Sequence, residues 1–239
     1  MLDPAAQSRN PVGNGSARCA SAPGAESAAL PDLLLIERAR AGDERAVEAL
    51  IRRYIRRLFR VAWSVLMDEE RAEAAVLEGC LAAFGDLSRY ELTGKFAAWL
   101  TRLTYNQARA LRDPARGRRA AAPGAGPMPQ AAPDAAGAAR RDLEGAIGRL
   151  PEAFRTVYVL RLLEGVSGIE TAACLGVHET TVRTRLYRAH RRIEAGAAGR
   201  VPTTAGLLEP SPERTERIVS RVPARLFHGS IPTTSASAP

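Results

Sequence analysis

The residues of this chain with the clearest chemical potential are five arginines in one short stretch of its second half. They lie between Thr180 and Arg192, in the segment TTVRTRLYRAHRR, which contains no acidic residue. A guanidinium group is always ionised and binds phosphate, or the edge of a guanine, through a planar pair of donors. This stretch therefore predicts contact with nucleic acid, and a merely solvated helix face is the alternative.

The residues ahead of this stretch predict two helices joined by a tight turn. Ser167 and Glu170 have the spacing of a capping box, in which each side chain accepts a hydrogen bond from the other residue's backbone at the start of a helix. Gly176 ends that helix, because glycine readily adopts the positive φ of a helix C-cap. Val177 fills the angle between the two helices. The range 166–193 thus reads as a helix-turn-helix.

The second helix of this motif has one apolar stripe, with polar residues on its other faces. The stripe consists of Val182, Leu186, Ala189 and Ile193, at spacings of four, three and four residues. In a helix-turn-helix protein such a helix lies in the major groove, with its N-terminal residues at the base edges. The pattern predicts a helix that packs through its stripe and reads DNA with its arginines.

Composition and motif content exclude several other classes of function. The chain of 239 residues has a net charge of +8, and Lys95 is the one lysine among its 34 basic residues. It contains no phosphate-binding glycine loop, no zinc-protease motif and no nucleophile elbow, so we expect neither an enzyme nor a cofactor. Cys19, Cys80 and Cys174 do not form a disulfide framework, and we expect Cys174 to pack in a core rather than to bind a metal with His178.

The chain also lacks the segments that would direct it to a membrane or out of the cell. We find no apolar run of the roughly 18 residues that a membrane span needs, and no signal peptide. An odd number of separated cysteines is typical of a reducing compartment. The sequence therefore predicts a cytoplasmic protein.

Helical periodicity throughout, with no competing strand pattern, predicts an all-α protein of two small helical domains, the second carrying the helix-turn-helix. A flexible linker rich in proline and alanine joins them, with five prolines in 28 positions. We expect each domain to have its own core. The predicted divisions are a disordered N-terminus (1–30), a first helical domain (31–112), the linker (113–140), a second helical domain (141–196) and a C-terminal extension (197–239).

The first domain holds a long amphipathic helix with two kinds of face. Its apolar face runs from Val47 to Val65, and a separate stripe of arginines runs along it. That stripe is open to two interpretations, a solvated face or a binding surface. Its members are Arg52, Arg53, Arg56, Arg57 and Arg60.

The C-terminal extension contains one further amphipathic stretch. It begins at Ser211, which is followed by Pro212, and it carries Ile218, Val219 and Val222 at helical spacing. Two interpretations stay open, a helix that docks on a neighbouring element and a helix of marginal stability.

These features together resemble the extracytoplasmic-function sigma factors, the small two-domain members of the bacterial sigma-70 family. The resemblance covers about 160 residues. The range 143–193 is similar to region 4 of the family, including the leucine-proline pair, the glycine-valine turn and the threonine-valine-arginine opening of the last helix. AGDERAVEALIRRYIRRLFRVA and FAAWLTRLTYN resemble parts of region 2. The resemblance implies a sigma factor that binds core RNA polymerase and directs promoter-specific transcription initiation.

Roles for individual residues follow from the resemblance. It implies that region 4 reads the minus-35 element as duplex DNA through His178, Thr181, Arg183, Thr184, Arg185, Arg188 and Arg191. Region 2 would contact the single-stranded minus-10 element through Tyr90, Lys95, Trp99, Arg102 and Asn106, with the loop 87–95 forming a pocket for a flipped base. The helix carrying Glu73, Glu78 and Leu81 would dock on the polymerase. An anti-sigma factor is a further partner that the family implies.

The sequence departs from the family pattern in the helix expected to dock on the polymerase. Ala74 and Leu77 stand where the family commonly has an aspartate and a glutamine, and Ala110 replaces an aspartate beyond Asn106. Two other functions stay open. One is a stand-alone helix-turn-helix regulator that binds duplex DNA without polymerase. The other is an adaptor whose basic helices bind an acidic protein.

Overall fold

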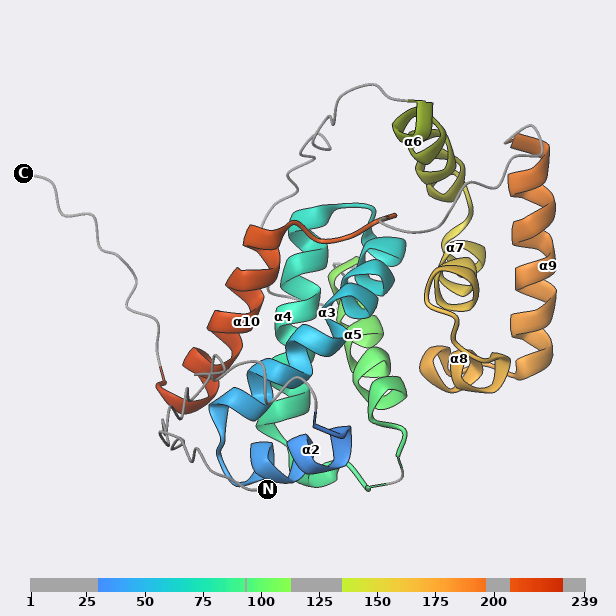
Figure 1. The fold of residues 1–239 in the computed structure, drawn as a ribbon. Helices are drawn as coiled ribbons and strands as arrows, with labels where there is room; N and C mark the ends of the chain where they lie inside the picture. The colour runs from blue at the N-terminus through green and yellow to red at the C-terminus, as the bar shows by residue number, and fades with distance from the viewer. Residues whose placement is uncertain (1–29, 93, 113–134, 197–206, 230–239) are drawn as a thin grey trace, which may run out of the picture.

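The structure, a computed structural model, describes residues 30–92, 94–112, 135–196 and 207–229. Within these ranges the chain forms helices and no β-strand, as the sequence predicts for an all-α protein. The helices fall into two groups that lie side by side, with the last helix returning to the first group (Figure 1).

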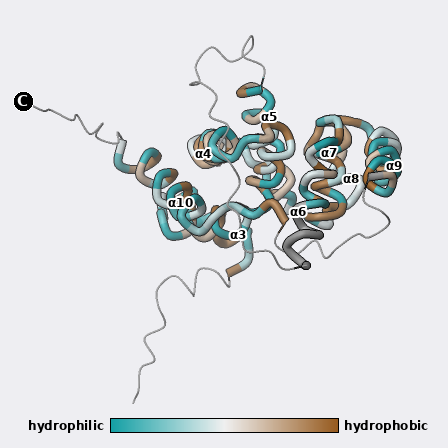
Figure 2. The backbone as a smooth tube through the Cα atoms, turned by 90° about the horizontal axis from the view of Figure 1, so that it is seen from above, coloured by the Kyte–Doolittle hydropathy of each residue, from teal (hydrophilic) through white to brown (hydrophobic). Residues whose placement is uncertain are grey.

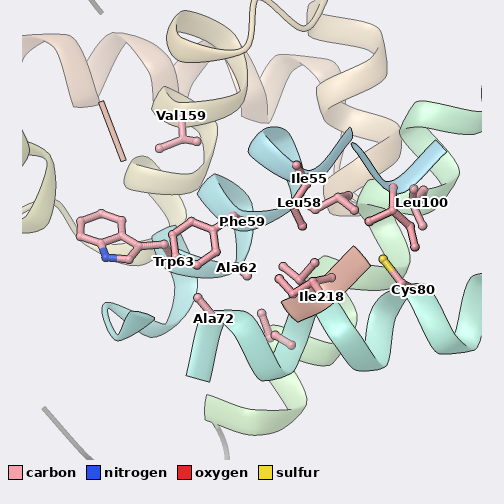
Figure 3. Close-up of a cluster of buried hydrophobic side chains, with 14 of the residues drawn as sticks. Ile55, Leu58, Phe59, Ala62, Trp63, Ala72, Cys80, Leu100, Val159 and Ile218 are labelled. Atoms are coloured by element: carbon pink, nitrogen blue, oxygen red, sulfur yellow. The ribbon is translucent and has the colours of Figure 1, made fainter. Parts of the chain in front are cut away.

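The first group is built around one long buried helix, α3 (Glu44–Leu66). Asp43 caps its N-terminus by accepting hydrogen bonds from the backbone N–H groups of Arg45 and Ala46, at 3.0 and 3.3 Å. Its apolar side chains pack against the neighbouring helices, as the close-up of Phe59 and Ala62 shows (Figure 3). The helices around it are α2 (Asp32–Arg40), α4 (Glu69–Gly85) and α5 (Phe96–Arg112).

The second group contains the helix-turn-helix. It begins with α6 (Ala135–Gly148), and α7 (Glu152–Tyr158) continues directly into the π-helical turn η2 (Val159–Leu163). The short helix α8 (Gly168–Leu175) and the long helix α9 (Glu179–Gly196) complete the group. Since α6 begins at Ala135, the last residues of the range 113–140 are helical. Residues 113–134 lie outside the described part of the chain, as do residues 1–29.

The two groups do not have separate cores, so that expectation was wrong. One buried cluster joins Leu50 and Phe59 of α3 to Ile147 and Tyr158 of the second group, and another joins Val61 to α7 and α8. Both groups bury apolar faces against each other because neither is large enough to cover its own. Polar contacts reinforce the junction: Arg155 donates to the carbonyl of Ser64, at 2.5 Å.

The arginine stripe of α3 is divided between several partners instead of forming one face. Arg60 is 2% exposed, which contradicts a solvated position. It donates to the carbonyl of Leu207 at 2.8 Å and forms an ion pair with Glu164 at 2.6 Å. Arg52 pairs with Glu216 at 2.7 Å. Much of the stripe therefore meets the C-terminal segment of the chain, which local sequence could not reveal.

That C-terminal segment forms α10 (Pro212–Phe227), which packs on α3 and α4. Figure 1 shows it beside α4, on the opposite side of the first group from α7 to α9. Of the two interpretations of the stretch, the docked helix is therefore the correct one. In the described part of the chain no helix has the length and apolar character that crossing a membrane requires.

The crossing of α4 over α5 depends on Gly79. A Cβ atom at this position would lie 2.7 Å from Oγ1 and 2.8 Å from Cα of Thr104. Because Cα belongs to the backbone, rotation of the Thr104 side chain cannot relieve this clash. We expect Gly79→Ala to lower the free energy of unfolding by about 1–3 kcal/mol, measured by urea denaturation.

A matched control is Gly145→Ala in α6, where the nearest atom to a new Cβ is Arg149 Nη1 at 3.5 Å. There the higher helix propensity of alanine should raise the free energy of unfolding by about 0.5–1 kcal/mol. Equal effects of the two substitutions would contradict the close approach of α4 and α5.

Candidate functional site

The helix-turn-helix has the local structure that its sequence predicts. The hydroxyl of Ser167 accepts a hydrogen bond from the N–H of Glu170 at 3.2 Å, and the N–H of Ser167 donates to the Glu170 carboxylate at 3.3 Å. Gly176 adopts φ 65° and ψ 40°, the left-handed conformation that ends α8. Both predicted features of the turn, the capping box and the glycine C-cap, are therefore confirmed.

Helix α9 packs through its predicted stripe. Val182, Ala189 and Ile193 are buried, and Leu186 is partly buried. Arg192, on one flank, lies over the ring of Phe154 at 5.4 Å. The residues expected to read duplex DNA are exposed or half-buried, and their cationic members form no ion pair within the described ranges. They are His178, Thr181, Arg183, Thr184, Arg185, Arg188 and Arg191.

The position of α9 leaves this basic face accessible. Figures 1 and 2 agree that α9 lies at the outer edge of the molecule, with α7 and α8 between it and the first group of helices. In Figure 2 polar colours dominate its outward side. An outer helix with arginines that have no acidic partner has the geometry for entering a DNA groove.

A second candidate site lies at the N-terminal end of α5, where three aromatic rings meet. The centroids of Tyr90 and Trp99 are 5.2 Å apart, those of Tyr90 and Phe96 are also 5.2 Å apart, and Phe96 and Trp99 are separated by 5.8 Å. Phe96 and Tyr90 are buried, while Trp99 is only partly buried. The cluster fixes the rings of Tyr90 and Trp99 beside an open hollow.

That hollow is a cavity of about 280 Å³. Its lining includes four residues that the sequence analysis selected, and the described structure gives the buried hydroxyl of Tyr90 no hydrogen-bond partner. A planar base is a group that can stack on such rings. The lining residues are Arg89, Tyr90, Glu91, Lys95, Ala98, Trp99, Arg102 and Ala173.

Sequence reasoning missed part of this cavity. Arg89 directly precedes Tyr90 in the loop, and this proximity was a signal that could have identified it. Ala173 belongs to α8, more than 70 positions along the chain, so no local pattern pointed to it. Asn106 is exposed on α5, one turn beyond Arg102, and does not line the cavity.

The third candidate site, on α4, is occupied by another part of the chain. Glu73 accepts hydrogen bonds from Arg217 at 2.9 and 2.7 Å and from Arg214 at 2.7 Å. Partial burial by itself would raise the pKa of Glu73, but the two guanidinium groups hold it below its ordinary value. Glu78 pairs with Arg225 at 2.9 Å, and Leu81 is partly buried.

Neither described cysteine has the setting of a reactive or metal-binding group. Cys174 is buried, as predicted, and its thiol donates to the carbonyl of Ala98 at 3.6 Å. Burial raises the pKa of Cys80 to about 12 and that of Cys174 to about 11, so both thiols stay protonated at neutral pH. Among the residues that the structure describes, no cluster of three or more potential ligands could hold a metal ion.

A helix-turn-helix together with a second aromatic and basic site is typical of DNA-binding transcription proteins. Comparison with known families agrees. Residues 50–117 match the model of sigma-70 region 2, and residues 140–193 match that of sigma-70 region 4. The first match contains most of α3, α4 and α5, and the second contains the helix-turn-helix.

Individual relatives narrow the class to one family. The chain is 32% identical over 157 residues to the ECF RNA polymerase sigma factor SigM of Mycobacterium tuberculosis, covering 64% of this chain and 78% of SigM. It is 28% identical to the RNA polymerase sigma-H factor of Pseudomonas aeruginosa, covering 68% of this chain and 92% of the relative. The structure of CnrH bound to the cytosolic domain of CnrY is similar, with a TM-score of 0.52 and 29% identity over 69% of this chain and 95% of CnrH.

The chain therefore belongs to the extracytoplasmic-function sigma factors, transcription initiation factors of the sigma-70 family.

The capping box of α8 provides a test of the turn itself. Ser167→Ala removes the acceptor for the N–H of Glu170, and we expect it to lower the free energy of unfolding by about 1 kcal/mol. Ser167→Asp keeps an acceptor and should retain the stability of the natural chain. Thermal denaturation of both variants measures the difference, and an alanine variant as stable as the aspartate variant would show that the cap contributes nothing.

Proposed function

We propose that region 4 of this sigma factor reads the minus-35 promoter element through α9. The observation that carries the proposal is the exposed basic face of α9, whose arginines have no acidic partner in the described structure. Arginine donors near the N-terminus of the helix would contact guanine edges, and the others would contact phosphates. The assigned residues are His178, Thr181, Arg183, Thr184, Arg185, Arg188 and Arg191.

Region 2 would hold the separated strand of the minus-10 element at the cavity beside α5. An unstacked base would enter the cavity and stack on Trp99 and Tyr90, while Lys95 and Arg102 at its edge would neutralise phosphates. Asn106 would contact the strand one helical turn farther along α5. The aromatic cluster and the unpartnered hydroxyl of Tyr90 support this assignment.

Core RNA polymerase is the proposed protein partner, and α4 is the proposed docking helix. Glu73, Glu78 and Leu81 would contact it, with Ala74 and Leu77 on the same helix as departures from the family pattern. The solved relative CnrH is bound to the cytosolic domain of CnrY. We include an anti-sigma factor as a second candidate partner. The chain would act in the cytoplasm, without catalysing a reaction itself.

We also propose the division of the chain that the sequence suggests. The region 2 domain would extend over 31–112 and the region 4 domain over 141–196, and the range 113–140, whose last six residues belong to α6, would connect them. The family matches at 50–117 and 140–193 support this division.

Transcription with purified core polymerase tests the function as a whole. We expect the full chain to direct initiation at a discrete set of promoters, detected by run-off transcripts and mapping of their start sites. Duplex binding without polymerase-dependent initiation would favour a stand-alone regulator. Tight binding to an acidic protein, with no preference for DNA, would favour an adaptor.

The role of α9 is tested by Arg183→Ala on the assembled holoenzyme. If Arg183 contacts a guanine edge, its loss should cost about 1–3 kcal/mol in binding free energy at the minus-35 element. Fluorescence anisotropy with a duplex from a mapped promoter measures this cost. Arg192→Ala is the control, because Arg192 lies over Phe154 and should change affinity much less. Similar losses in both variants would indicate a general charge effect.

The role of the cavity is tested by Tyr90→Phe. Removing a buried hydroxyl that has no partner should leave the free energy of unfolding unchanged, whereas the loss of a hydrogen bond to a base should weaken binding of minus-10 single strands by about 0.5–1.5 kcal/mol. Anisotropy with a labelled single strand measures the loss, and the minus-35 duplex serves as the control probe. Unchanged single-strand affinity would remove Tyr90 from the site.

A further inference from the structure

Helix α10 lies outside both family matches, yet it is firmly seated on region 2. The matches end at residue 193, while α10 spans Pro212–Phe227. Its apolar side chains Ile218, Val219 and Val222 are at most 1% exposed and belong to the central core. Figure 3 shows Ile218 close to Phe59, Ala62 and Ala72 of α3 and α4. The helix is thus an integral part of the observed packing.

The charged contacts of α10 are directed at the acidic residues of α4. Arg214 pairs with Glu69 at 3.1 Å and with Glu73 at 2.7 Å, and Arg217 also pairs with Glu73 at 2.7 Å. One end of the helix is therefore held by a shared carboxylate. Near the other end, Arg225 pairs with Glu78 at 2.9 Å.

The segment leading into α10 is also anchored. Leu207 and Leu208 are buried, and the carbonyl of Leu207 accepts a hydrogen bond from the buried Arg60 at 2.8 Å. The N–H of Leu208 donates to Glu144 of α6 at 3.4 Å. The segment therefore bridges both groups of helices before α10 crosses α4.

These contacts engage the two acidic residues that we assign to polymerase docking: Glu73 is largely covered, with its side chain 13% exposed, whereas Glu78 is paired but remains 49% exposed. A basic helix seated on Glu73 and Glu78 neutralises their charge and fills the adjacent surface, so a partner that uses the same carboxylates cannot bind at the same time. We propose that α10 is an internal mask, which occupies the docking face of α4 and must leave before core polymerase binds. The proposal rests on the proposed docking role of α4.

Two of the ion pairs that hold α10 on α4 are partly exposed to solvent, so changes in these pairs can shift the balance between the docked and the released helix. The Arg217 and Arg225 side chains are 45% and 41% exposed, so their ion pairs are weakened by salt and by competing charge. If only the released form binds polymerase, the apparent affinity falls in proportion to the released fraction. A substitution that favours release should then tighten binding without altering α4 itself.

The experiment measures the affinity of the full chain for core polymerase, using a fluorescently labelled factor. We expect Arg217→Glu and Arg225→Glu each to tighten binding about 3- to 10-fold, and the double variant to tighten it further. Arg221→Glu is the matched control, because Arg221 lies on the same helix, is exposed, and makes no ion pair in the described structure. It should bind as the natural chain does.

The pair formed by Arg225 and Glu78 separates the two proposals. Glu78→Lys breaks the same contact from the other side, but it also alters the docking face, so it should weaken binding while Arg225→Glu tightens it. Weaker binding by Glu78→Lys with no gain from the arginine variants would overturn the mask and keep α4 as the docking helix. A gain from the arginine variants with no loss from Glu78→Lys would keep the mask and remove Glu78 from the docking site.

Hydrogen exchange gives a readout that does not depend on polymerase. Amides of α10 should exchange faster in the double variant than in Arg221→Glu, because the charge reversal shifts the helix toward its released form. Faster exchange of α10 together with unchanged polymerase affinity would overturn the proposal.

Discussion

The burial of one guanidinium group is the constraint on which the arrangement of this sigma factor depends. Arg60, in the C-terminal third of α3, is 2% exposed, and leaving such a charge without partners would cost several kcal/mol. Its partners come from two distant segments: Glu164 and the carbonyl of Leu163 at the end of η2, and the carbonyl of Leu207 together with Glu209 ahead of α10. Satisfying Arg60 therefore requires region 2, region 4 and the C-terminal segment to meet at one point.

The proposed binding surfaces differ in how far the chain's own helices cover them. The basic face of α9 lies at the outer edge and has no acidic partner in the described structure. The cavity beside α5, by contrast, includes Ala173 of α8 in its lining, and α4 lies under α10. This arrangement leaves the proposed DNA surface of α9 open, while other helices of the chain pack beside the cavity at α5 and over α4. Packing and recognition thus share the same helices.

Much of the site was accessible from the sequence because its determinants are local. The capping box of Ser167 and Glu170, the left-handed Gly176 and the apolar stripe of α9 involve residues within a few positions of one another. Local steric and hydrogen-bonding preferences favour such features without contributions from distant residues. The loop containing Tyr90 and the helix containing Trp99 are also close in sequence, so their association was predictable.

The sequence by itself determined most of the helices, the caps of α8 and the basic face of α9. Only the tertiary structure decided that Arg60 is buried, that the two cores are joined, and that Arg214 and Arg217 meet Glu73 more than 140 positions away. An arginine on an amphipathic helix has the same local pattern whether it faces water, DNA or a carboxylate. Which of these it meets depends on which distant element the apolar faces bring beside it, and that choice is made by burial over the whole chain.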